Sequence, residues 1–170
     1  MKPLGNVIDI VPAFRPVDLQ TAANSGDYVS LKNAQGVLIL FHSAIGTAGD
    51  DPTITVRQAQ DVSGTAVKDL AVITEVFTKQ AATALTSISG WTKVTQAAAA
   101  TYTNDTSAEQ EALWCIQIEA DQLDADNGFD CIAANVADVG GNAQLGACYY
   151  ILYGLRYKRS PELLASPIAN

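Results

Sequence analysis

The chain has 170 residues, long enough for one compact domain, with 16% charged residues against about 25% in an average soluble protein, and 48% hydrophobic residues. So few charges indicate either a large buried core or an outer surface that lies against other subunits. The formal net charge is −8, with no Lys or Arg between Lys93 and Arg156, which argues against a nucleic-acid-binding protein.

The N-terminal segment, residues 1–20, is predicted to form an extended arm. Pro3, Pro12 and Pro16 interrupt it. Because proline can neither continue a helix nor donate a hydrogen bond to a sheet, we do not expect a packed element here.

The interior is predicted to consist of short β-strands, because runs rich in Val, Ile, Thr and aromatic residues alternate with turn residues. In chain order the predicted strands are Asp27–Leu31, Val37–His42, Thr53–Gln60, Lys68–Lys79, Trp91–Gln96, Leu113–Ala120, Phe129–Val136 and Ala147–Tyr153. One helical turn is allowed at residues 106–111, where a hydroxyl residue precedes Glu or Gln by three positions. About eight strands without alternating helices predict an all-β fold, an antiparallel β-sandwich of jelly-roll type over residues 21–157.

The strand patterns also predict which side chains face the core. Val37–His42, VLILFH, is continuously apolar over its first five residues and is predicted to be buried on both faces. The other side chains predicted to point inward alternate along their strands: Ile54, Val56, Trp114, Ile116 and Ile118.

The C-terminal segment, residues 158–170, is predicted to form a second extended arm, because Pro161 and Pro167 interrupt it. Both arms are apolar (NVIDIVPAF and PELLASPIA), which indicates that they lie on a partner or on their own domain. The apolar arm residues predicted to contact a partner are Val7, Ile8, Ile10, Val11, Phe14, Leu163, Leu164 and Ile168.

The compartment is inferred from three features. The N-terminus has no signal-peptide pattern, and the longest apolar run of the first half, Val37 to Phe41, is far too short to cross a membrane. Cys115, Cys131 and Cys148 are odd in number and widely spaced, which is typical of buried free thiols in a reducing compartment. We therefore expect a soluble chain made in the cytoplasm that makes no membrane contact.

Catalytic patterns are weak. The chain's one histidine, His42, is followed by Ser43, but neighbours on a strand point to opposite faces, and there is no G-x-S-x-G elbow or phosphate loop. We predict a strand-end histidine with a single hydrogen bond, no catalytic site and no cofactor.

Residues 124–130, DADNGFD, place Asp124, Asp126 and Asp130 at positions 1, 3 and 7 of an EF-hand loop. The template fails at its positions 5, 6 and 12, which are Gly128, Phe129 and Asn135. Asn127-Gly128 predicts instead a hairpin turn between the strands Leu113–Asp121 and Phe129–Val136. A weak cation site that uses the three aspartates stays open as the alternative.

The stretch from residue 124 to residue 157, DADNGFDCIAANVADVGGNAQLGACYYILYGLRY, resembles the C-terminal part of small structural proteins of tailed bacteriophages. The segments GDYVSLKNAQGVLILFH, DDPTITVRQAQDVSG and SGWTKVTQ are similar to other stretches of the same proteins, so the resemblance covers residues 20–157. The matching residues are packing and turn sequences, not catalytic signatures.

The resemblance implies a β-rich, non-enzymatic virion component. We expect an auxiliary decoration or cement protein on the capsid surface, made in the cytoplasm of the bacterial host, that binds neighbouring major capsid protein subunits. Such proteins commonly form homotrimers or homodimers. The alternatives are a tail or neck component and a calcium- or carbohydrate-binding adsorption module.

Overall fold

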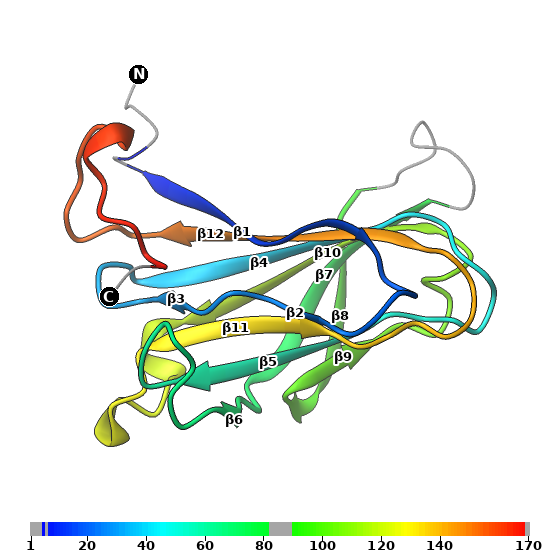
Figure 1. Cartoon of the computed structure of the whole chain (residues 1–170), viewed down its shortest axis with the longest axis horizontal. Helices are drawn as coiled ribbons and strands as arrows, with labels where there is room; N and C mark the ends of the chain where they lie inside the picture. The colour runs from blue at the N-terminus through cyan, green and yellow to red at the C-terminus, as the bar shows by residue number, and fades with distance from the viewer. Residues whose placement is uncertain (1–4, 6, 82–89, 169–170) are drawn as a thin grey trace.

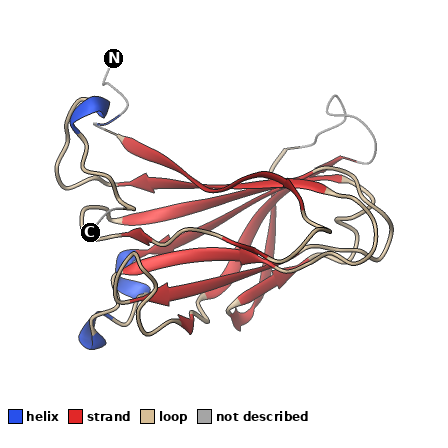
Figure 2. Cartoon of the chain, viewed as in Figure 1, coloured by secondary structure: helices blue, strands red, loops and turns tan. Residues whose placement is uncertain are grey.

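The chain folds into two antiparallel sheets that pack against each other (Figure 1). The computed structural model describes residue 5 and residues 7–81 and 90–168. Sheet A has the strand order β1-β12-β4-β10-β7-β8, and sheet B has the order β2-β11-β5-β6, with β3 also paired to β11 and β9 to β5. Helix is confined to short turns (Figure 2). The predicted all-β, antiparallel class is therefore confirmed.

Twelve strands form in the described part of the chain. Sheet A contains β1 (Ile8–Asp18), β4 (Gly36–Ser43), β7 (Ile73–Ala81), β8 (Thr92–Ala99), β10 (Glu111–Glu119) and β12 (Leu145–Tyr153). Sheet B contains β2 (Asn24–Ser25), β3 (Val29–Ser30), β5 (Thr53–Ala59), β6 (Lys68–Asp69), β9 (Thr101–Thr103) and β11 (Cys131–Val136). The 3-10 turns are η3 (Ala120–Gln122), η4 (Ala125–Asn127) and η5 (Pro161–Leu163). Strands β1, β2 and β9 have no counterpart among the predicted strands.

The N-terminal arm prediction is wrong for residues 8–18. These residues form β1, which pairs antiparallel with β12 at the edge of sheet A. The register shifts between Pro12 and Phe14 and again between Phe14 and Val17. An edge strand tolerates proline because one side of its backbone has no partner strand, so the prolines do not exclude β1 from the sheet.

The C-terminal segment also returns to its own domain. The backbone N–H of Ser30 donates to the carbonyl of Pro167 (2.8 Å), and that of Arg159 donates to the carbonyl of Gly5 (3.4 Å). A Cβ at position 5 would collide with the Arg159 carbonyl, so glycine allows this close approach. The two terminal segments therefore lie together at one end of the sandwich (Figure 1).

The core lies between the sheets and confirms the alternation predicted in Thr53–Gln60 and Leu113–Ala120. All five inward-facing side chains predicted from the sequence, Ile54, Val56, Trp114, Ile116 and Ile118, are buried. The Trp114 ring lies 5.1 Å from the Phe41 ring of sheet A and 4.9 Å from the Tyr102 ring of sheet B. Trp114 thus joins the two sheets through aromatic contacts.

Residues 106–111 do not form the allowed helical turn. The backbone N–H of Ser107 donates to the carbonyl of Asn104 (3.0 Å), which closes a turn. The Asp51 carboxylate accepts from the N–H of Ala108 (2.8 Å) and from the hydroxyl of Ser107 (3.1 Å). The Asp51 side chain, which belongs to another loop, therefore accepts the hydrogen bonds that a capping residue within 106–111 would have accepted at the start of a helix.

Candidate protein-binding surfaces

Residues 120–130 cross from one sheet to the other. β10 belongs to sheet A and β11 to sheet B, so the predicted hairpin between them is wrong. The crossing contains η3 and η4, and Gly128 follows η4 with a φ of 80°, a left-handed conformation that glycine adopts without steric cost. The chain does turn sharply at Asn127–Gly128, but the turn connects two layers.

Asp124 is held by its neighbours. Its carboxylate forms an ion pair with Lys68 and accepts two hydrogen bonds from the Asn127 amide (2.8 and 2.9 Å). The Lys68 ammonium also lies 4.0 Å from the centre of the Phe129 ring. The hydrogen bond from Lys68, followed by that from Asn127, lowers the pKa of Asp124.

Asp126 and Asp130 do not join Asp124 in one site. Asp130 forms an ion pair with Lys32 at 3.0 Å, whereas Asp124 pairs with Lys68, and Asp126 is exposed. Among the residues that the structure describes, no group of three or more His, Cys, Asp or Glu side chains is arranged to hold a metal ion. Two of the three aspartates, Asp124 and Asp130, therefore form ion pairs with lysines.

His42 and Ser43 point to opposite faces of β4, as predicted. The His42 Nε2 atom lies 3.2 Å from the Glu111 carboxylate on the outer side of sheet A, whereas Ser43 is fully buried. The three cysteines are free thiols. Burial raises the pKa of Cys131 and of Cys148 to about 12, so both stay protonated and are poor nucleophiles.

The terminal end exposes large hydrophobic side chains. Val7 lies beside the start of β1, and the C-terminal segment contributes Tyr157, Leu163 and Ile168, each at least 43% exposed. The basic residues Arg156, Lys158 and Arg159 lie exposed in the same segment. Apolar and cationic groups therefore share one end of the molecule, a combination that suits contact with a protein surface that is apolar in part and acidic in part.

A cavity of about 320 Å³ lies beneath this segment. Its walls come from the end of the sandwich, including Asp9 and Leu152, and from residues 164–167 of the returning chain. The Lys32–Asp130 ion pair and Cys131 also line it. Two of its charged groups, Lys32 and Asp130, are paired with each other, and burial raises the pKa of its Cys131 thiol, which is therefore protonated.

The outer face of sheet A, which points away from sheet B, is unusually apolar. One row of directly opposed residues crosses it as Ile10, Ile151 and Leu38, and a second row crosses it as Pro12, Tyr149, Leu40, Cys115 and Phe77. Apart from the exposed Ile10 and Pro12, these side chains are half-buried. The core cluster found among the described residues includes none of them. We call these two rows the apolar face.

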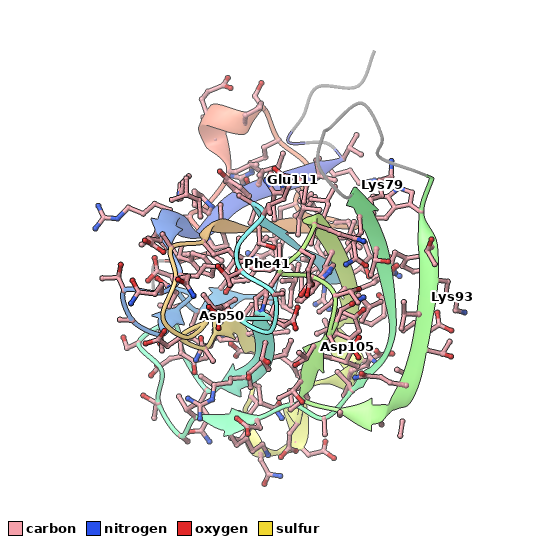
Figure 3. The ribbon with its side chains drawn as sticks, turned by 90° about the vertical axis from the view of Figure 1, so that its right-hand side faces the viewer. Phe41, Asp50, Lys79, Lys93, Asp105 and Glu111 are labelled. Carbon is pink, nitrogen blue, oxygen red and sulfur yellow. The ribbon has the colours of Figure 1, made fainter. Side chains whose placement is uncertain are left out.

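The apolar face corrects one prediction. Val37–His42 was expected to be buried on both sides, but Leu38 and Leu40 are only half-buried because sheet B covers the inner side alone. Polar and charged groups lie around the two rows and have partners within the chain: His42 contacts Glu111, Lys93 pairs with Glu75, and Lys79 lies 4.9 Å from the centre of the Trp91 ring. Figure 3 shows Lys93 on the outside of the sheet, at the β8 edge.

The predicted partner-contact residues divide into three groups. Val7, Leu163 and Ile168 are exposed at the terminal end. Ile8 and Ile10 lie on the outer side of β1, next to Tyr153 and Ile151 of β12. The remaining three residues pack inward: Val11 is part of the core, and Phe14 and Leu164 pack against it.

Sequence reasoning missed the apolar face. The signal was present in the outward positions of two strands, at Leu38 and Leu40 and again at Tyr149 and Ile151. Only the pairing of β4 with β12 brings these residues together.

Among the described residues, no helix is long and apolar enough to span a membrane. No protein-family model, no curated protein and no solved structure matches this chain.

Proposed function

We propose that the protein is a structural component of a bacteriophage particle that binds the outside of the capsid and cements neighbouring major capsid protein subunits. The observation that carries the proposal is the terminal end, where Tyr157, Leu163 and Ile168 are exposed beside basic residues. The resemblance of residues 20–157 to structural proteins of tailed phages supports it. The protein acts by binding and catalyses no reaction.

We also assign the sandwich to the jelly-roll type, and the nested strand pairs support this. The first strand pairs with the last (β1 with β12), the next strands with the last but one (β2 and β3 with β11), then β4 with β10 and β5 with β9. Such nesting is what results when one long antiparallel ribbon wraps around a core. β6, β7 and β8 are inserted between β5 and β9, and β7 and β8 extend sheet A.

The terminal end suits a cement protein because it is built from both chain termini and is tied to the domain. Ser30 and Gly5 hold the C-terminal segment by backbone hydrogen bonds, so its side chains are presented with little ordering cost on binding. Each copy adds a modest apolar contact, and many copies on one shell together stabilise it through multivalent binding.

Co-sedimentation with shells assembled from the particle's major capsid protein tests the proposal. Deleting the first sixteen residues would remove most of β1 and disturb the fold, so we choose the double variant Leu163→Ser/Ile168→Ser. We expect this variant to stay folded and to lose shell binding. The matched control is Ile45→Ser/Val67→Ser, which removes two exposed apolar residues elsewhere and should bind as the wild type does.

Unchanged binding of the Leu163→Ser/Ile168→Ser variant would refute the terminal contact. Electron microscopy of labelled particles separates the alternatives, because a cement protein covers the shell in many copies whereas a tail or neck component occupies one vertex. Heat released on titration with calcium, and lost in Asp124→Ala, would favour the adsorption module instead.

A further inference from the structure

We propose that the apolar face of sheet A is a twofold interface between two copies of this chain. The inference goes beyond capsid binding and does not depend on it, because capsid binding uses the terminal end. It rests on the strand pattern, on the size of the sheet and on the distribution of charge.

The strand pattern is that of a sheet covered on both sides. An antiparallel strand with one wet face alternates apolar and polar residues. β4 does not alternate, since Leu38 and Leu40 point outward while Val37, Ile39 and Phe41 fill the core. β12 repeats the feature, because Tyr149 and Ile151 point outward beside them. Sheet B covers the inner side of sheet A, so a second cover is missing on the outer side of the single chain.

The size of the sheet fits a stable interface. Six strands about 4.8 Å apart, each about eight residues long at a rise of about 3.3 Å, give the whole outer side of sheet A, which contains the apolar face, a size of roughly 24 by 26 Å, or ~600 Å² in projection. The accessible area of a corrugated surface exceeds its projection, and a standard interface buries about 800 Å² on each partner. Sheet-on-sheet packing at about 10 Å is also the arrangement that already joins sheets A and B in this chain.

The distribution of charge favours a second copy of the chain as the partner that covers the apolar face. A chain with a net charge of −8 repels its own copies unless they meet through a face that is nearly neutral. Along β12, β4, β10, β7 and β8 the outer side of sheet A carries three acids and two lysines, a formal charge of −1: Glu75, Glu111, Glu119, Lys79 and Lys93.

Each acid already has a partner in its own chain. Glu75 pairs with Lys93, and Glu111 pairs with His42. Glu119 accepts a hydrogen bond from the Tyr153 hydroxyl (2.5 Å). Two copies can therefore meet without burying a carboxylate that has no hydrogen-bond or ion-pair partner, and the same patch meets itself around a twofold axis.

Sedimentation equilibrium of the purified full chain tests the inference. We expect the wild type to show about twice the chain mass of 17.9 kDa. The variant Leu38→Lys/Leu40→Lys places two charges in the middle of the face and should sediment as a single chain. The control Ile45→Lys/Val67→Lys makes the same charge change at exposed apolar residues outside the face and should stay dimeric. Circular dichroism verifies that each variant is folded.

Cys115 provides a second measurement that needs no charged variant. It is half-buried in the middle of the face, whereas Cys131 and Cys148 are fully buried, so it is the thiol expected to react with a maleimide in the folded chain. We expect labelling of the wild type to slow as protein concentration rises, and Cys115→Ser to abolish it. In the milder variant Leu38→Thr/Leu40→Thr, the Cys115 thiol should react with the maleimide at the same rate at every protein concentration.

Three results would overturn the inference. The first is a wild type that sediments as a single chain at high concentration. The second is a dimer that persists in the folded Leu38→Lys/Leu40→Lys variant, with Cys115 labelling independent of concentration. The third is a dimer that is lost in Leu163→Ser/Ile168→Ser, which would place the contact at the terminal end.

Discussion

Replacing Tyr150 by Phe should destabilise the protein by removing one hydrogen bond between the sheets. Tyr150 lies on β12 of sheet A and is fully buried, and its hydroxyl oxygen accepts the backbone N–H of Ala134 on β11 of sheet B at 2.8 Å. Gly26 lies so close that a Cβ there would be 2.5 Å from this hydroxyl oxygen, so the site is tightly packed. The phenylalanine ring fills the same space, and the Ala134 N–H is left buried without its acceptor.

An unpaired buried donor costs about 1–3 kcal/mol. For a domain of this length each kcal/mol lowers Tm by about 2–4 °C, so a loss of about 2 kcal/mol lowers Tm by about 4–8 °C. Thermal unfolding followed by circular dichroism, with all proteins at one concentration, measures the change. The matched control is Tyr157→Phe, which removes a hydroxyl from a 64% exposed ring and should leave Tm unchanged. A drop of less than about 1 °C in Tyr150→Phe would refute the reasoning.

Three further predictions concern the core and two titrating groups. Trp114→Ala should cost about 3–5 kcal/mol in urea unfolding, because it empties a fully buried site between the sheets. Burial raises the pKa of Cys148 from 9.0 to about 12, so the unfolded chain loses this proton at a lower pH than the folded chain does, and the free energy of unfolding should fall between pH 9 and about 12. Urea unfolding across that range should show a smaller fall for Cys148→Ala than for the wild type. The hydrogen bond from Lys68 lowers the pKa of Asp124 from 3.8, so its contribution to stability is present above pH 3.8 and is lost as the pH falls below it; Asp124→Asn should be less stable than the wild type at neutral pH, and the difference should shrink in acid.

Local patterns predicted the strands well where one face meets the core. Alternation in Thr53–Gln60 and Leu113–Ala120 identified inward side chains that are all buried. This succeeds because the period of a strand is set by its own backbone, so any sheet that contains the strand must use the same two faces. The odd number and wide spacing of the cysteines predicted free, buried thiols, and all three are free, although Cys115 is only half-buried because it points outward.

Predictions failed where a distant segment decides the outcome. Asn127–Gly128 turns the chain, but whether a turn closes a hairpin or crosses between layers depends on which strands flank it in space. The prolines of residues 8–18 argued against a packed element, yet an edge position tolerates them. That edge position exists only because β1 pairs with β12, more than a hundred residues further along the chain.

The amino-acid sequence by itself determined an all-β chain, the places of most strands and the side of each that faces the core, because backbone period and turn chemistry act over a few residues. The tertiary structure alone decided which strands are neighbours and which sheet face has a cover. The run VLILFH shows the division clearly, since its apolar pattern indicates two covered sides whereas the folded chain supplies one. Long-range pairing gathers Leu38, Leu40, Tyr149 and Ile151 into one surface, and no short stretch of sequence contains that information.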